Sequence, residues 1–254
     1  MRIVKPIGKY SEEQARKSLR KGIPIIMISY AFLLVTGLDY LPIYINLGKL
    51  APAGNFLAGV VFMYGLMQFF VPYQRWKSGL NGERRVAKNL SDKLSDEYSM
   101  YNDVLLKDGQ RSGNIDHIIV GPTGIFVVET KNNQGAITYD RYGWKGMGEN
   151  RNPIFQVNKN MFRIKDILKN CEVFTDKSLY LKSIVLFSNP KADLKIMNEP
   201  DYGCIVHQIK SVADPSLADL IKNEPARFSD HEIKKIEQCL ENSIGNWITI
   251  KDKN

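Results

Sequence analysis

Two long apolar stretches lie close together near the start of the chain. The first runs from residue 22 to about residue 45, and the second covers residues 52–73. A helix needs about 20 mostly apolar residues to cross the hydrocarbon core of a bilayer. The second stretch meets this length without a charged side chain, and the first meets it if it extends beyond Asp39. Residues 22–73 are therefore predicted to form a two-helix transmembrane hairpin.

Two other interpretations of these stretches are open. One is a buried helical hairpin in a soluble protein, although neither stretch shows the polar face that such a hairpin presents to water. The other is a cleaved signal peptide, since Ala51-Pro52-Ala53 resembles a small-residue cleavage site. That site lies farther along the chain than an ordinary signal allows, and a second apolar span follows it.

Lysine and arginine flank the two stretches unevenly. They are frequent within residues 1–21 and again within residues 75–88, whereas the connection between the stretches carries only Lys49. An excess of lysine and arginine marks the cytoplasmic side of a membrane protein. The chain is therefore predicted to be a multi-pass protein of the cell membrane with both termini cytoplasmic, and residues 1–21 are its basic cytoplasmic N-terminal segment.

From Leu80 onward the pattern changes to that of a soluble domain. Helical spacing of apolar residues predicts helices over 82–98, from Asn152-Pro153 to about 170, and from Ser229 to about 245. The apolar residues of the second of these helices include Phe155, Phe162, Ile164 and Leu168, and Glu232 completes a capping box at the start of the third. Strands are predicted over 101–106, 114–121, 124–131, 136–139, 180–187 and 204–207.

The resulting order is α-β-β-β-α-β plus additions, which indicates an α/β fold around one mixed sheet. Residues 80–210 are predicted to form this domain, and residues 211–254 a C-terminal helical extension. Gly143, Gly146 and Gly148 follow no strong strand and are predicted to lie in a flexible loop rather than a phosphate-binding loop.

Composition narrows the choice of partners. The 254 residues include 35 Lys+Arg against 27 Asp+Glu, a net charge of +8 that suits nucleic acid or the inner face of a membrane. The three cysteines, Cys171, Cys204 and Cys239, lie far apart and form no CxxC pair. We therefore expect reduced thiols, with neither a disulfide framework nor a zinc site.

One predicted hairpin carries the most chemical information. Its turn is Gly121-Pro122-Thr123-Gly124, so Val120 faces Ile125 and Ile118 faces Val127. Continuing this register places Asp116 opposite Glu129, and Lys131 shares their face because it lies two residues farther along the strand.

Two carboxylates that face each other repel and need compensation. Mg²⁺ offers it, because this hard cation prefers carboxylate oxygen and water. A bound Mg²⁺ polarises a phosphodiester and lowers the pKa of an attacking water. The alternative is a solvated end of the sheet at which Lys131 pairs with Glu129.

Three segments around these residues resemble a known family. They are the helix GERRVAKNL, the hairpin IDHIIVGPTGIFVVETK and the following NPIFQ, which together are similar to the NERD (nuclease-related) domain of the PD-(D/E)xK nuclease-like superfamily. The resemblance covers roughly residues 82–189 and implies an αβββαβ core. Members are often joined to transmembrane segments, which agrees with the two apolar stretches. The first acid lies in an Ile-Asp-His sequence rather than the Pro-Asp usual for this subgroup.

The resemblance implies roles for individual residues. Asp116 and Glu129 are expected to be ligands of Mg²⁺ or Mn²⁺, and Lys131 the catalytic lysine. Glu83 and Gln156 match the acid of the first helix and the glutamine of the second, and Gly82 matches the glycine at the first helix's start. By the alternation of the strand, His117 points to the opposite face from Asp116, so it is expected to serve packing or to lie on the surface rather than to join the site.

These observations predict a membrane-anchored, cytoplasm-facing, Mg²⁺-dependent nuclease whose favoured substrate is DNA. Arg84, Arg85 and Lys88 are candidate contacts to phosphate, although lipid headgroups or water suit them equally. The alternative is a non-catalytic module that keeps the fold and binds nucleic acid or a protein at the membrane. The oligomeric state is open, and a homodimer fits enzymes that cut both strands of a duplex.

Overall fold

The computed structural model describes residues 1–5, 7, 9–37, 51–108, 111–148, 152–171 and 179–245. The chain forms two compact units, of which one comprises Met1–Ile7 with Asn81–Asn254 and the other Gly8–Leu80. The boundary falls inside helix α2 (Ala51–Ser91), so a single helix contributes to both units.

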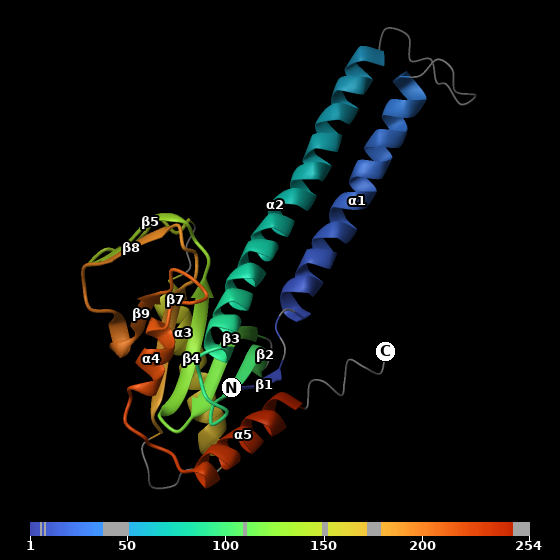
Figure 1. Cartoon of the computed structure of the whole chain (residues 1–254). Helices are drawn as coiled ribbons and strands as arrows, with labels where there is room; N and C mark the ends of the chain where they lie inside the picture. The colour runs from blue at the N-terminus through green and yellow to red at the C-terminus, as the bar shows by residue number, and fades with distance from the viewer. Residues whose placement is uncertain are drawn as a thin grey trace. The chain divides into compact units, whose positions relative to one another are not determined.

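The unit formed by residues 8–80 is a pair of helices, α1 (Lys9–Gly37) and the larger part of α2, drawn side by side in Figure 1. Glycines bring the two backbones close together. A Cβ added to Gly22 would lie 2.7 Å from Phe69 Cβ, and one added to Gly65 would lie 3.0 Å from Ile25 Cγ2. Small residues serve the same purpose where helices pack in membranes.

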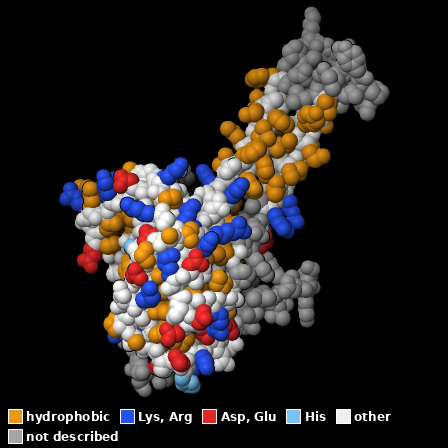
Figure 2. Space-filling view, viewed as in Figure 1, with side chains coloured by type: hydrophobic (Ala, Val, Ile, Leu, Met, Phe, Trp, Pro, Cys, Tyr) orange, Lys and Arg blue, Asp and Glu red, His pale blue; other side chains and the backbone are white. Residues whose placement is uncertain are grey.

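The outer surface of this helix pair is strongly apolar, as Figure 2 shows. Its exposed side chains include Met27, Ile28, Phe32, Phe56, Leu57, Val60, Met63, Met67 and Phe70. Within the described residues one helix, over Phe56–Ser91, is long and apolar enough to cross a membrane. The predicted two-helix hairpin is therefore not shown. Helix α1 carries Arg16, Lys17, Arg20 and Lys21 in its first half, and residues 38–45, the predicted end of the first span, lie outside the described residues.

The other unit is built on a mixed six-stranded sheet, in the order β1-β2-β3-β4-β7-β9. Its strands are β1 (Arg2–Lys5), β2 (Ser99–Asp108), β3 (Arg111–Gly121), β4 (Gly124–Lys131), β7 (Leu181–Phe187) and β9 (Ile205–Gln208). The pairs β2–β3 and β3–β4 are antiparallel, and the other pairs are parallel. A second sheet has the order β6-β5-β8, with β5 (Gly135–Asp140), β6 (Gly143–Lys145) and β8 (Ala192–Ile196).

Helices cover both faces of the large sheet and create two apolar cores. Helices α3 (Pro153–Asn170) and α5 (Asp230–Gly245) pack on one face, where Ile164, Leu168, Ile236 and Leu240 are fully buried. The C-terminal end of α2 and the short α4 (Ser216–Lys222) pack on the other face. The α/β fold with a mixed sheet is thus confirmed. Of the two helices predicted to form an extension, α5 contributes buried residues to the first core and α4 to the second.

The start of α3 confirms the prediction made from Asn152-Pro153. Asn152 Oδ1 accepts the backbone N–H groups of Ile154 and Phe155, which would otherwise lack partners at the helix N-terminus. The capping box of α5 is also present, because Glu232 Oε2 accepts the backbone N–H of Ser229 at 2.8 Å and Ser229 Oγ accepts that of Glu232 at 3.4 Å.

Two local predictions are wrong, and a third segment has structure that was not predicted. The helix predicted over 82–98 ends at Ser91 and is the last part of α2, because the apolar stretch before it continues as helix without a break. Residues 143–145 form β6 rather than a flexible loop, because Trp144 packs 5.0 Å from the ring of Tyr139 and 5.5 Å from that of Phe187. Residues 2–5, predicted as part of a basic segment, pair with β2 as an edge strand.

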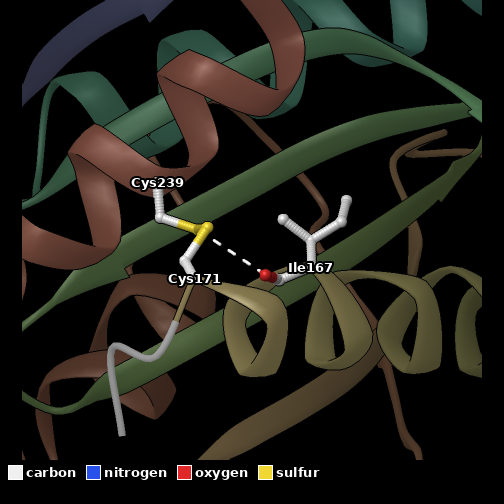
Figure 3. The surroundings of a disulfide bond; sticks show 3 residues. All are labelled: Ile167, Cys171 and Cys239. Atoms are coloured by element: carbon white, nitrogen blue, oxygen red, sulfur yellow. Dashed lines mark hydrogen bonds between the residues drawn. A yellow bond between two sulfur atoms is a disulfide. The ribbon is translucent and has the colours of Figure 1, made fainter.

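The expectation of reduced thiols is also wrong for two of the three cysteines. Cys171, at the end of α3, and Cys239, in α5, form a disulfide across 68 residues of sequence (Figure 3). The packing of α5 beside α3 brings the two together, with Cys239 Sγ 3.6 Å from the carbonyl oxygen of Ile167. Cys204 is a buried free thiol.

Gly82, expected at a helix start, lies in the interior of α2 and permits close packing there. A Cβ at this position would lie 2.8 Å from Ser188 Oγ and 2.9 Å from Asn132 Cβ. Gly82→Ala is therefore expected to lower the free energy of unfolding by about 1–3 kcal/mol through overpacking. Gly79→Ala is the matched control, because nothing lies within 4 Å of its added Cβ. It should raise helix stability by roughly 0.5–1 kcal/mol. Denaturant titration of both variants compares the two effects, and equal shifts would contradict the packing argument.

Candidate active site

The β3–β4 hairpin has the predicted register up to the position of the acids. Gly121 pairs with Gly124, Val120 with Ile125 and Ile118 with Val127, and the ladder continues to His117 and Val128. One residue farther on, a side chain replaces the backbone as the hydrogen-bond acceptor, since Asp116 Oδ2 accepts the backbone N–H of Thr130 at 2.6 Å. The carboxylate of Asp116 is thereby held against β4 beside Glu129.

Lys131 lies between an acid and an amide. Its Nζ is 2.6 Å from Glu129 Oε1, on the same strand, and 3.4 Å from Gln156 Oε1, in the first turns of α3. Glu129 is 3% exposed, so this ion pair is shielded from water. The pairing of Lys131 with Glu129 that the sequence left open is present, and Gln156 lies within reach of the same lysine.

Glu83 brings a third carboxylate from α2. It is 8% exposed, and its Oε2 has no hydrogen-bond partner among the residues that the structure describes. Burial raises the pKa of Glu83 to about 7, and the negative charges of Asp103 and Glu129 add to the effect against the opposing charge of Arg84. Near neutral pH this group is therefore divided between its acid and carboxylate forms.

The pKa of Asp116 is likewise raised well above its ordinary value. Burial is the largest cause, followed by the charges of Glu129 and Glu83. Lys131 and the N–H of Thr130 oppose the shift by stabilising the carboxylate. Carboxylates on three separate elements thus interact electrostatically at one end of the sheet.

Sequence reasoning missed a fourth acid, Asp103 in β2. It is 3% exposed and has a left-handed φ of 53°, which is uncommon outside glycine. The pairs on either side of it, Asn102–His117 and Val104–Ile115, place Asp103 next to Asp116 across the β2–β3 ladder. The signal was present, because aspartate is depleted in strand interiors and this one lies inside a predicted strand.

The three basic residues predicted to contact phosphate differ in their exposure to solvent. Arg84 and Lys88 lie on the exposed face of α2, one turn apart. Arg85 is half-buried, and its guanidinium donates to the carbonyl of Ser188 and to Asn132 Oδ1. Arg85 therefore ties α2 to the ends of β4 and β7, whereas Arg84 and Lys88 lie on the exposed surface.

His117 has the packing position expected of it. It is fully buried, and its Nδ1 lies 2.7 Å from Asn102 Oδ1. Burial lowers the pKa of His117 to about 3, so the imidazole is neutral at physiological pH.

The carboxylates are chemically suited to bind a divalent cation, but their positions do not already form a metal site. Carboxylate oxygens are the donors that Mg²⁺ prefers, and the raised pKa values of Glu83 and Asp116 record negative charge that a cation would offset. No three His, Cys, Asp or Glu side chains in the described ranges already lie in an arrangement that holds a metal. In the structure Lys131 supplies the compensating charge.

The raised pKa of Glu83 predicts a pH-dependent stability. Below its ordinary pKa of about 4.5 the group is neutral in both folded and unfolded chains, and as pH rises through about 7 the fold must hold a buried charge. Without divalent cation, Glu83→Gln should therefore stabilise the chain more at pH 8 than at pH 5, by on the order of 1–3 kcal/mol. Denaturant titrations at both pH values measure the difference. Glu199→Gln, at an exposed carboxylate, should show none, and equal responses would sink the prediction.

Comparison with known proteins covers the part of the chain that holds these residues. Residues 78–188 match the family model of the nuclease-related domain. The chain is also 31% identical over 133 residues to an uncharacterized protein of Bacillus anthracis, in a match that covers 49% of this chain and 58% of that protein. The chain thus spans less than two thirds of that relative. No solved structure matches the chain. Residues 78–188 are accordingly similar to nuclease-related domains.

Proposed function

We propose that the nuclease-related domain hydrolyses phosphodiester bonds in nucleic acid, most favourably DNA, with Mg²⁺ or Mn²⁺ as cofactor. The observation that carries this proposal is the gathering of Glu83, Asp116 and Glu129 at one end of the sheet, with Lys131 bonded to Glu129. Buried acids that raise one another's pKa are costly to a fold, and such groups are concentrated at functional sites.

Asp116 and Glu129 would hold the cation, and Glu83 would complete the negative charge around it. When bound, Mg²⁺ polarises the phosphodiester and lowers the pKa of the attacking water. Lys131 would orient that water or stabilise the negative charge that develops on phosphate. Gln156 positions the lysine through its contact with Nζ, and Arg84 and Lys88 would contact phosphates on either side.

We further propose that residues 22–73 cross the membrane twice and leave the nuclease-related domain in the cytoplasm. Support comes from the apolar outer surface of α1 and α2 and from the lysines and arginines that precede the first apolar stretch and follow the second, against Lys49 alone between them. Cysteine labelling decides the orientation. A cysteine at position 49 should react in intact cells, and one at position 254 only after permeabilisation. The reverse pattern would exclude it.

The activity is tested on the purified full chain in detergent. Supercoiled, linear and single-stranded DNA and RNA are incubated with Mg²⁺, with Mn²⁺ and with EDTA. We expect cleavage that requires the cation and that Asp116→Asn removes. If a well-folded chain cuts none of these substrates, the enzyme proposal fails.

One observation favours the non-catalytic alternative. Lys131 already neutralises Glu129 in the structure, which is what a module without metal chemistry requires. Such a module would bind nucleic acid or a protein at the membrane without cutting. Binding that is unaffected by the removal of Mg²⁺, together with no cleavage, would support it.

A further inference from the structure

A groove of about 400 Å³ lies on the outer side of α3, against the short 3₁₀ helix η2 (Asp201–Gly203). It begins at Phe155, the residue before the site residue Gln156, and follows the helix to Asp166. At 1.5 Å per residue this distance is about 16 Å. The groove therefore starts beside the candidate active site and leads away from it.

Three aromatic rings line the groove and remain exposed to solvent. Phe155 is 66% exposed, Phe162 45% and Tyr202 76%. Phe155 and Phe162 were expected among the apolar residues of the helix, but the core face of α3 is formed by Val157, Ile164 and Leu168. Exposing large rings forgoes burial worth about 1.5–3 kcal/mol for each side chain. These rings therefore form an apolar surface suited to a flat ligand.

Tyr202 is held in an unusual position. Its φ of 59° lies in the left-handed region, where a non-glycine residue costs about 1–3 kcal/mol. In this conformation its ring lies edge-on to Phe162, with ring centroids 6.5 Å apart and planes at 90°. In such an edge-to-face pair the two rings do not cover each other completely, so ring surface remains available for a ligand to stack on.

A buried amide donor points to a polar ligand group. Asn158 lines the groove and is 3% exposed, and its Oδ1 accepts from Ser183 Oγ at 2.6 Å. Its Nδ2 has no hydrogen-bond partner among the described residues. A buried donor without a partner costs about 1–3 kcal/mol, which an acceptor on a ligand would recover.

The charges around the groove favour an anion. Lys159 and Arg163 line it against the one acid Asp166. Aromatic rings, a free amide donor and two cations on one helix face match a nucleotide, which has a flat base, base carbonyl oxygens and a negative phosphate.

We infer that this groove binds unpaired bases of single-stranded nucleic acid and leads the strand to the candidate active site. The inference rests on the proposed function and narrows its substrate to single strands or unpaired ends. A base stacks on Phe162 and Tyr202, and an acceptor on the base meets Asn158. Lys159 and Arg163 contact the backbone. A stacked duplex offers no open base face to these rings.

The test measures binding by the full chain in detergent, in EDTA so that nothing is cut. The probes are a fluorescent oligothymidine strand and a blunt duplex of the same length, followed by anisotropy. Phe162→Ala and Tyr202→Gly remove exposed rings, and the glycine also relieves the left-handed backbone, so both variants should fold. Each should weaken single-strand binding by about fivefold to a hundredfold and change duplex binding less than twofold.

Asn158→Asp keeps the acceptor for Ser183 and removes the donor, so it should also weaken single-strand binding. Tyr142→Ala is the matched control. Tyr142 is 75% exposed and has the cations of Arg141 and Lys145 against its ring, but it lies outside the groove. Its removal should leave binding unchanged.

The outcomes separate this inference from the proposed activity. Selective loss of single-strand binding in the ring variants supports the groove even if the parent cuts nothing, in which case only the nuclease proposal fails. Unchanged binding, or an equal loss for strand and duplex, overturns the groove even if the parent is an active nuclease. A parent that binds neither probe also overturns it.

Discussion

Lys131→Ala and Glu129→Gln are each expected to reduce metal-dependent cleavage by on the order of a hundredfold or more. Lys131→Ala removes the charge that would stabilise developing negative charge on phosphate and leaves the carboxylates in place. Glu129→Gln keeps the shape of the side chain and removes one charge from the ligand set. Initial cleavage rates of the parent and both variants, at saturating Mg²⁺, measure the effect.

Binding of nucleic acid should survive both substitutions, because it would depend mainly on Arg84, Lys88 and the α3 groove. Lys145→Ala is the control for the lysine. Lys145 also lies 2.6 Å from an acid, Asp140, but this pair is on an exposed surface, and its loss should leave the rate unchanged. A Lys131→Ala protein with the parental rate would remove the lysine from the mechanism.

Reducing the Cys171–Cys239 disulfide is expected to lower the free energy of unfolding by about 4 kcal/mol. The bond closes a loop of 68 residues, and a crosslink across a loop of this length removes much of the conformational entropy of the unfolded chain. Denaturant titration with and without reductant measures the change. The double variant Cys171→Ser/Cys239→Ser should have the stability of the reduced parent and should not respond to reductant.

A response of the double variant to reductant would contradict this assignment, since Cys204 is then the one remaining cysteine. The disulfide also bears on the proposed orientation, because the cytosol keeps most thiols reduced. If the domain faces the cytosol, rapid alkylation of intact cells should find Cys171 reactive. Cys171 protected from alkylation until reductant is added would instead favour an oxidising compartment.

Local patterns were sufficient for much of the domain. The turn at Pro122-Thr123 determines the hairpin register, because its glycines and the β-rich runs beside it leave one pairing that buries every apolar side chain on a core face. Asn152 and Pro153 determine where α3 begins. The Asn152 side chain caps free backbone N–H groups of the first turn, and Pro153 has no N–H that would need a partner. The transmembrane prediction rests on length and hydropathy, and within the described residues the structure supports one such helix rather than two.

The fourth acid and the groove could not be assigned in the same way. Asp103 joins the acids through an unusual backbone angle and a neighbouring strand, and strand order is a property of the whole sheet. Phe155 and Phe162 have the apolar character of core residues, and the packing of α3 against the sheet decides that they face outward. Tyr202 reaches Phe162 from 40 residues farther along the chain.

The sequence by itself determined the order of the main elements α2, β2, β3, β4, α3 and β7, the hairpin and the acid, acid, lysine spacing, because each depends on residues within a few positions of one another. Only the tertiary structure decided that Arg85 serves packing, that Cys171 meets Cys239 and that Glu83 is buried among other carboxylates. These features depend on which surfaces of distant helices and strands come into contact. Such contacts are set by the burial of the whole core, and no short window of sequence contains that information.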